Sequence, residues 1–393
     1  MAIKPLGIYI HVPFCRSKCE YCDFYSLGGS RSKELMEGYQ EAVTMHIREA
    51  ARLAPGYFVD TIYFGGGTPS FYGAEGLIRI LREIDRRFAV AKDVEISLEA
   101  NPDSVDLKSL KTLRRAGFNR ISIGVQSDLD EQLKALGRPH TYEQARRAVI
   151  DAKSAGFDNV SVDLMFGLPN QSRQMWMGTL EHIMELRPNH ISCYGLKVEP
   201  GTPLYDYQDY AGLPDEDVQA DMYLYCVETL ESYGYFQYEI SNFAQAGYEC
   251  QHNLKYWQGG EYLGFGPAAA SDFAGKRFTC VSDLKAYVEG ITQNGSVLSE
   301  CDSIPLHDRA GEYLMLRLRT ADGVEASEYN SSFRMSFAPI EEELKKFQEQ
   351  GLAAYENGRW HFTARGFLVS NDLLARLLLA QQESSPLQVL SNS

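Results

Sequence analysis

The sequence predicts an α/β fold: an incomplete, laterally open (β/α)6 barrel followed by an α+β, winged-helix-like C-terminal domain. Three observations support this prediction. The N-terminal half repeats a short β-branched or aromatic run followed by an amphipathic stretch, which is the pattern of βαβ units. Six such units take up about 200 residues, whereas a closed eightfold barrel takes roughly 250. After Pro203 the alternation stops, and the chain instead shows helical segments and a hairpin turn at Asn357-Gly358.

The six expected strands are apolar, β-branched or aromatic runs bounded by turn residues. They cover residues 7–12, 60–64, 94–98, 120–125, 159–165 and 190–196. An amphipathic segment follows each of the first five strands and is expected to be a helix. These helices cover residues 32–53, 74–88, 106–116, 141–155 and 172–186. Gly117, Gly156 and Pro188 are helix-ending signals at three of these boundaries.

Beyond the sixth strand the pattern changes from βα alternation to helices and aromatic runs. Residues 215–233 are expected to form a helix, and residues 235–278 form an aromatic segment with many glycines. Further helices are expected at residues 308–319, at 340–350 and from 371 onward. We therefore divide the chain into a barrel (residues 1–205), a linker region (206–300) and a helical winged-helix-like domain (301–393).

Composition restricts the possible functions. The chain has 393 residues, 38 Lys and Arg against 53 Asp and Glu, and a net charge of −15. This acidic balance argues against nucleic acid as a partner, because phosphate binding depends on Lys and Arg. Winged-helix modules often bind DNA, but this one has no dense basic run, so we expect it to serve in packing or interaction. No apolar run has the length of a spanning helix and the start does not resemble a signal peptide, so we expect a cytoplasmic protein.

Three of the eight cysteines, Cys15, Cys19 and Cys22, lie within eight residues with the spacing Cys-x3-Cys-x2-Cys. The other five are scattered without metal-binding spacing. Three thiolates can each bind one iron of a [4Fe-4S] cluster and leave the fourth iron open to a small chelating molecule. A structural zinc site is the alternative, although it would require a fourth nearby Cys or His.

Polar side chains occur at or near the carboxyl ends of three of the expected strands. They are Glu99, Gln126 and Asp163. In barrel-like folds the carboxyl ends of the strands form the active face, and polar groups there are costly unless they meet a ligand or water. The glycine-rich turn after the second strand, residues 64–69, lies at the same end and would let backbone groups approach a ligand. These features predict one binding pocket beside the cysteines.

Residues 9–24, which include the three cysteines, resemble the radical S-adenosylmethionine (SAM) motif, and residues 64–69 resemble the glycine-rich turn of that superfamily. The resemblance extends over nearly the whole chain and narrows to the oxygen-independent coproporphyrinogen III oxidase-like group. It implies a [4Fe-4S] cluster on the three cysteines and a bound SAM. By this resemblance the SAM-contacting residues are Tyr9, Tyr21, Gly66, Gly67, Thr68, Glu99, Gln126, Arg138 and Asp163.

Two differences favour the haem-chaperone (HemW) branch of this group over the oxidases. The oxidases carry an additional Cys where this chain has Phe24, and they have a long extension before the motif, where this chain has 14 residues before Cys15. Residues 251–257 are also similar to the HNxxY motif of the HemW branch. That similarity implies a haem site that includes His252 and Tyr256, and imidazole is a suitable ligand for haem iron.

The resemblance thus implies a radical-SAM-type chaperone that binds a cluster, SAM and haem and delivers haem to recipient haemoproteins. The alternative is a working coproporphyrinogen III oxidase that decarboxylates propionate side chains. We do not expect that activity, whereas cleavage of SAM stays open. The sequence also leaves open which haemoprotein receives the haem, whether the chain forms a homodimer, and whether it meets a membrane through its partners.

Overall fold

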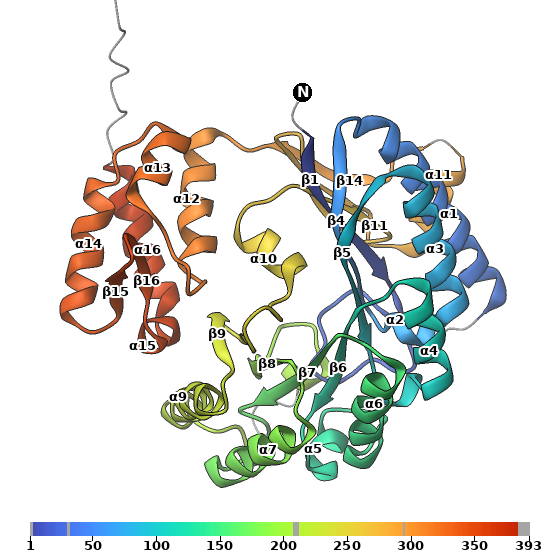
Figure 1. The fold of residues 1–393 in the computed structure, drawn as a ribbon, viewed down its shortest axis with the longest axis horizontal. Helices are drawn as coiled ribbons and strands as arrows, with labels where there is room; N and C mark the ends of the chain where they lie inside the picture. The colour runs from blue at the N-terminus through green and yellow to red at the C-terminus, as the bar shows by residue number, and fades with distance from the viewer. Residues whose placement is uncertain (1–2, 30–31, 207–211, 294, 384–393) are drawn as a thin grey trace, which may run out of the picture.

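The computed structural model describes residues 3–29, 32–206, 212–293 and 295–383, and its centre is a twelve-stranded sheet in the order β14-β13-β12-β11-β1-β4-β5-β6-β7-β8-β10-β9. The parallel centre of this sheet contains the six strands expected from the sequence. They are β1 (Lys4–Val12), β4 (Tyr57–Gly66), β5 (Ala89–Ala100), β6 (Arg120–Gln126), β7 (Asn159–Phe166) and β8 (His190–Gly195). These strands curve into the open barrel in Figure 1, which confirms the predicted fold class.

Five long helices cover the outer face of the barrel strands, at the positions that the amphipathic segments predicted. They are α1 (Lys33–Leu53), α3 (Ala74–Arg87), α4 (Leu107–Ala116), α6 (Tyr142–Ala155) and α7 (Arg173–Leu186). Asp106, Thr141 and Ser172 each form a capping box at a helix start, because their side chains accept a hydrogen bond from the backbone three residues on. Short connecting helices complete this half of the chain: α2 (Pro69–Tyr72), η1 (Pro102–Ser104), α5 (Asp130–Ala135) and α8 (Pro203–Asp206).

Six further strands extend the sheet at both edges. They were not predicted, because residues 235–278 were interpreted as an aromatic segment within a linker region at 206–300. They are β9 (Phe236–Glu239), β10 (Asn242–Ala244), β11 (Tyr262–Phe265), β12 (Ala270–Phe273), β13 (Lys276–Cys280) and β14 (Leu298–Ser303). β11 pairs in parallel with β1, and β10 pairs antiparallel with β8. The helices of this region are α9 (Glu216–Ser232), α10 (Gln251–Trp257) and α11 (Leu284–Thr292).

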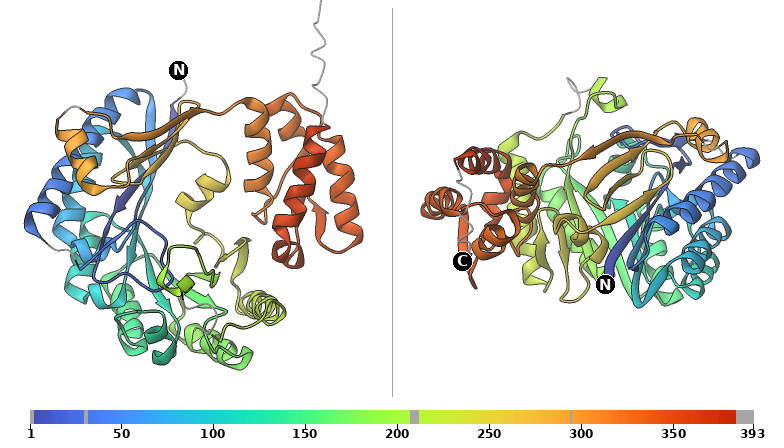
Figure 2. Two further views of the ribbon diagram at one scale, coloured as in Figure 1. Left: turned by 180° about the vertical axis from the view of Figure 1, so that it is seen from behind. Right: turned by 90° about the horizontal axis from the view of Figure 1, so that it is seen from above.

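The C-terminal part is a group of helices around a two-stranded hairpin, as expected. Its elements are α12 (Leu306–Arg317), α13 (Ala326–Phe333), α14 (Ala338–Glu349), β15 (Ala353–Glu356), β16 (Arg359–Phe362), α15 (Ala364–Leu368) and α16 (Ser370–Gln382). It lies on the side of the molecule opposite α1 and α3 (Figures 1 and 2). Backbone hydrogen bonds connect it to the sheet edge, where Ile240 donates to Arg319 O (3.0 Å) and Ala321 donates to Tyr238 O (3.0 Å).

The short helix α10 fills the space between the barrel and the C-terminal part, and it contacts both β4 and α12. Along the barrel strands, apolar side chains such as Ile8 and Ile62 are fully buried. Tyr9 and Tyr63, their neighbours in the chain, project to the opposite face because side chains alternate along a strand. Among the described residues, no helix has both the length and the apolar character needed to cross a bilayer.

Candidate functional site

The three motif cysteines lie in the loop after β1 and line one cavity of about 470 Å³. Two very short strands, β2 (Phe14–Cys15) and β3 (Leu27–Gly28), pair with each other and close the base of this loop. Cys15 and Cys19 are buried, Cys22 is partly exposed, and all three thiols are free. The loop therefore presents three unpaired sulfur atoms to a single cavity.

The glycine-rich turn packs directly against the cysteine loop. Gly67 N–H donates to Val12 O (2.9 Å), and Thr68 N–H donates to Phe14 O (2.8 Å). A Cβ atom at Gly66 would lie 2.7 Å from the His11 ring, and Gly66 has a φ of 107°, so glycine is required there for both space and conformation. The turn brings the Thr68 hydroxyl within 3.3 Å of Cys15 Sγ.

Two carboxyl groups line the same cavity from the ends of β5 and β7. Glu99 accepts hydrogen bonds from the Tyr63 hydroxyl (2.9 Å) and from Gly66 N–H (3.2 Å). Burial, and then the nearby charge of Asp163, raise the pKa of Glu99 to about 7. Asp163 accepts a hydrogen bond from the Ser122 hydroxyl (2.9 Å), and burial also raises its pKa. A cationic ligand group would relieve the cost of ionising these carboxyls.

Arg138 comes from the loop after α5, and Gln126 is the last residue of β6. The Arg138 guanidinium donates to Asn101 Oδ1 (2.8 Å), to Gly124 O (2.8 Å) and to Cys19 Sγ (3.5 Å). Gln126 has a φ of 67°, which is uncommon for a residue other than glycine, and β6 has an irregularity in its pairing with β7 at this point. The backbone of Gln126 is thus held in a costly conformation at the cavity wall.

Eight of the nine residues predicted to contact SAM line this cavity, and Tyr9 is the exception. Tyr9 instead lines a second, larger cavity. Asn101, Tyr194 and Lys197 also line the first cavity and were not among the predicted residues. Tyr194 and Lys197 lie at the end of β8, so the rule that found Glu99 on β5 would have found them on this strand.

The chemistry of the donor set fits an iron-sulfur cluster. Among the described residues, no three His, Cys, Asp or Glu side chains are grouped as a single metal ion would require. A [4Fe-4S] cluster requires a wider arrangement of ligands, because each thiolate binds a different iron atom of the cluster. Burial raises the pKa of Cys15 and of Cys22, so thiolates there need positive charge nearby. Arg138 supplies such a charge at Cys19.

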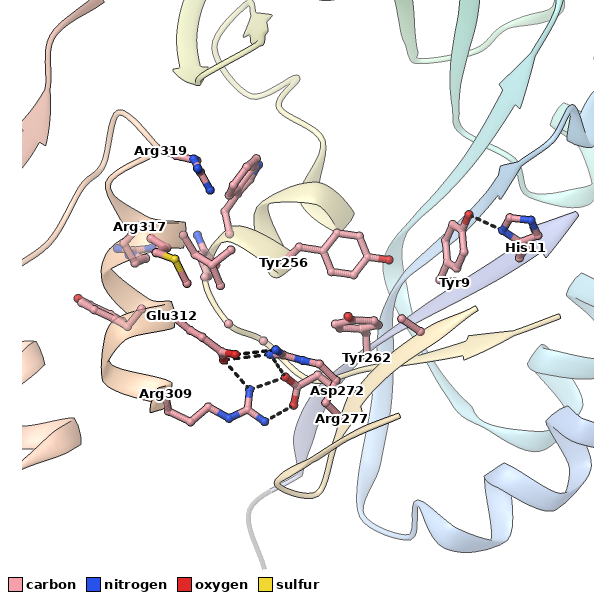
Figure 3. Close-up of a pocket in the computed structure, with 18 of the residues that line it drawn as sticks. Tyr9, His11, Tyr256, Tyr262, Asp272, Arg277, Arg309, Glu312, Arg317 and Arg319 are labelled. Carbon is pink, nitrogen blue, oxygen red and sulfur yellow. Dashed lines mark hydrogen bonds and ion pairs between the residues drawn. The ribbon is translucent and has the colours of Figure 1, made fainter. Parts of the chain in front are cut away.

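A second cavity, of about 790 Å³, lies between the barrel, β11–β13 and the C-terminal helix α12. Figure 3 shows Tyr9 and Tyr256 on one part of its wall and a network of charged side chains on another, with Tyr262 beside the network. The aromatic residues include Tyr9, Tyr256 and Tyr262. The network joins two arginines to two carboxylates, namely Arg277, Arg309, Asp272 and Glu312. The two cavities meet at the cysteine loop, because Asp23 and Phe24 line both.

The helix α10 carries the HNxxY-like segment along the wall of the second cavity. Its N-terminus is fixed by Glu95, which accepts hydrogen bonds from the backbone N–H groups of Gln251 (2.9 Å) and His252 (3.1 Å). The salt bridge between Lys255 Nζ and Asp60 Oδ2 (2.9 Å) holds the helix against β4. The segment is thus fixed to the barrel at two points.

His252 and Tyr256 lie together but have different surroundings. His252 is 0% exposed and its ring stacks on Tyr63 at 5.2 Å between centroids. Its Nδ1 is 2.9 Å from the Thr61 hydroxyl, and its Nε2 is 2.8 Å from the Tyr256 hydroxyl. Burial, helped by the charges of Lys255 and Arg120, lowers the pKa of His252 to about 3, so the imidazole is neutral. Tyr256 lines the cavity, whereas His252 lies behind it.

Comparison with known proteins agrees with this architecture. Residues 9–183 match the family model described as the radical SAM superfamily, and residues 304–369 match the HemN C-terminal domain. The chain is 34% identical to "Heme chaperone HemW" of Haemophilus influenzae, over 96% of this chain and 98% of that protein. It is 35% identical to "Heme chaperone HemW" of Escherichia coli, over 96% and 99% of the two chains.

Among solved structures, the chain superimposes on the coproporphyrinogen III oxidase HemN of Escherichia coli with a TM-score of 0.83. The identity is 23%, and the match covers 96% of this chain and 90% of the other, so this similarity establishes the fold alone. The family rests instead on the full-length relatives. Their identity and coverage, together with the family-model match over the barrel, show that this chain belongs to the radical SAM superfamily and, within it, to the HemW family.

Proposed function

We propose that this protein is a haem chaperone that binds a [4Fe-4S] cluster and SAM in the smaller cavity and haem in the larger one. It would then deliver haem to recipient haemoproteins in the cytoplasm. One observation carries the proposal: the segment with His252 and Tyr256 lines a large cavity that is distinct from the cavity of the three cysteines. A protein with two such cavities can hold a transferable cargo without displacing its resident cofactors.

The smaller cavity has the groups that a cluster and SAM need. Cys15, Cys19 and Cys22 would hold three irons, and the cluster, when bound, supplies a redox-active iron with an open coordination position. SAM carries a permanent sulfonium charge and an ammonium group. Glu99 and Asp163 are carboxyls whose ionisation is disfavoured by burial, so they gain from a cationic ligand.

The larger cavity suits a flat, mostly apolar ring with carboxylate substituents. Its volume falls in the range of about 300–1,000 Å³ that is usual for ligand sites. Tyr9, Tyr256 and Tyr262 offer aromatic faces to a macrocycle. Arg319 also lines this cavity, and a guanidinium pairs well with carboxylates such as the haem propionates. Arg277 and Arg309 line it too, but they are already paired with Asp272 and Glu312.

Filling the larger cavity tests the location of the haem. Ala270 lines this cavity, so Ala270→Phe should lower haem affinity at least tenfold, measured by titration of the Soret absorption. Ala89→Phe is the matched control, because Ala89 is exposed at the start of β5 and lines neither cavity. Equal affinity in both variants would place the haem elsewhere.

The same anaerobically reconstituted protein should be incubated with coproporphyrinogen, SAM and a reductant. The proposal expects no conversion to protoporphyrinogen, since Phe24 occupies the position of the additional Cys in the oxidases. Sustained turnover, with haem affinity unaffected by Ala270→Phe, would overturn the chaperone function in favour of the oxidase.

A further inference from the structure

Tyr256 and His252 form a hydrogen-bonded pair in which only the tyrosine faces the larger cavity. We propose that the Tyr256 phenolate oxygen is the protein ligand of ferric haem iron, and that His252 is a positioning residue that holds this oxygen. The inference rests on the proposed function and refines it, because it names the atom that binds the cargo. Tyrosine is an established axial ligand of ferric haem in proteins.

The burial of His252 argues against direct ligation by its imidazole. The side chain has no exposed surface, and each ring nitrogen already has a hydrogen-bond partner within 2.9 Å. To reach an iron in the cavity, the ring would have to break both bonds and leave its stack with Tyr63. A helix movement would have to break the contacts to Glu95 and Asp60 as well. Tyr256, in contrast, already lines the cavity.

The hydrogen-bond network around His252 can support a phenolate. The Thr61 hydroxyl can donate its proton to Nδ1, which leaves the hydrogen on Nε2 directed at the Tyr256 oxygen. When the iron–oxygen bond forms, the phenol O–H bond breaks and the proton leaves to solvent. The neutral imidazole then donates Nε2–H to the coordinated oxygen. No oxidant or reductant is needed, because the iron enters and remains ferric.

Tyr9 lines the same cavity and also contacts an imidazole, that of His11. This imidazole, however, accepts the hydrogen bond of the tyrosine hydroxyl. His11 Nε2 lies 2.9 Å from the backbone carbonyl of Tyr25, which can only accept a hydrogen bond. Nε2 must therefore carry the hydrogen, and in the neutral ring Nδ1 is an acceptor. The Tyr9 hydroxyl, 3.2 Å from His11 Nδ1, must donate and so keep its proton. Of these two tyrosines, Tyr256 is therefore the one whose imidazole partner can donate a hydrogen bond to a phenolate oxygen.

The test compares ferric haem complexes of the full-length protein by absorption and resonance Raman spectroscopy. The wild type should show a phenolate-to-iron charge-transfer band and the corresponding tyrosinate vibrations. Tyr256→Phe should lose these features and bind haem at least tenfold more weakly. Tyr9→Phe and Tyr262→Phe are matched controls, because each removes one phenol from the same cavity, and both should keep the features.

His252→Ala should keep the tyrosinate features but bind haem more weakly. If this variant does not fold, Thr61→Val perturbs the same hydrogen-bond network more mildly and should give the same result. A wild-type complex with imidazole features that are lost in His252→Ala and kept in Tyr256→Phe would overturn the ligand assignment alone. Absence of haem uptake by the wild type would instead overturn the proposed function.

Discussion

Glu99 should make SAM binding depend on pH in a range where few carboxyls titrate. Its pKa is raised to about 7, chiefly by burial, so the ionised form is disfavoured in the ligand-free protein. About one tenth of Glu99 is ionised at pH 6 and about one half at pH 7. If the cationic ligand binds the ionised form, affinity should rise about fivefold between these pH values, or about 1 kcal/mol. The sign follows from the raised pKa: affinity increases as the pH approaches 7 from below and levels off above it.

The assay is calorimetric titration of anaerobically reconstituted protein with SAM at several pH values between 6 and 7.5. Glu99→Gln should bind more weakly at pH 7.5 and lose the pH dependence. Glu239→Gln is the matched control, since burial also raises the pKa of Glu239 to about 7 but this residue lines neither cavity. A wild-type affinity that is constant over this range, or a dependence removed by Glu239→Gln, would refute the reasoning.

Three further outcomes are expected. Alanine at any of the three motif cysteines should abolish a cluster of about four irons, measured by iron analysis and absorption, and stoichiometric zinc in the wild type would contradict this. Trp176 is fully buried and its indole N–H donates to Met222 O (3.0 Å), so Trp176→Ala should destabilise the fold by about 3–5 kcal/mol in urea denaturation. Glu95→Ala should weaken haem binding, because it removes the acceptor for the N–H groups of Gln251 and His252; unchanged Soret titration would show that this anchor is unimportant.

The barrel could be predicted from sequence because its signals are local. Buried parallel strands are continuous apolar runs, and the helices between them begin at capping residues such as Thr141 and end at glycines such as Gly156. The outer strands lack these signals. The third residue of β11 is Gly264, where a Cβ atom would lie 2.2 Å from Ala270 O. Close packing therefore requires glycine, a residue that normally indicates a turn. The pairing of β11 with β1 joins residues more than 250 positions apart, so it depends on the tertiary fold and not on local sequence signals.

The site residues that lie at the ends of strands could be predicted from sequence. Residues whose place depends on how far along the strand they lie, or on tertiary contacts, could not. Glu99 and Asp163 line the cysteine cavity because parallel strands present their carboxyl ends at one edge. Tyr9 lies further from the carboxyl end of the sheet. It pairs with Tyr63, whereas Val12, three residues later, pairs with Gly66 of the glycine-rich turn. The sequence resemblance identified His252, but only the fold shows that both its nitrogen atoms are already hydrogen-bonded.

The two cavities are linked through charge as well as through the shared cysteine loop. Glu99 faces the cysteine cavity and accepts a hydrogen bond from Tyr63, whose ring stacks on His252, the partner of Tyr256. The pKa of Tyr256 is raised chiefly by burial, then by its neighbours Tyr9, Tyr262 and Cys250, and a negative charge on Glu99 makes a smaller contribution in the same direction. A cation bound at Glu99 would neutralise that charge and make the Tyr256 phenolate less costly. Because thermodynamic coupling is reciprocal, ferric haem on Tyr256 would likewise strengthen binding of a cation beside Glu99. If SAM and haem bind as proposed, occupation of the cysteine cavity would therefore favour haem binding in the larger cavity, and loss of either ligand would weaken binding of the other.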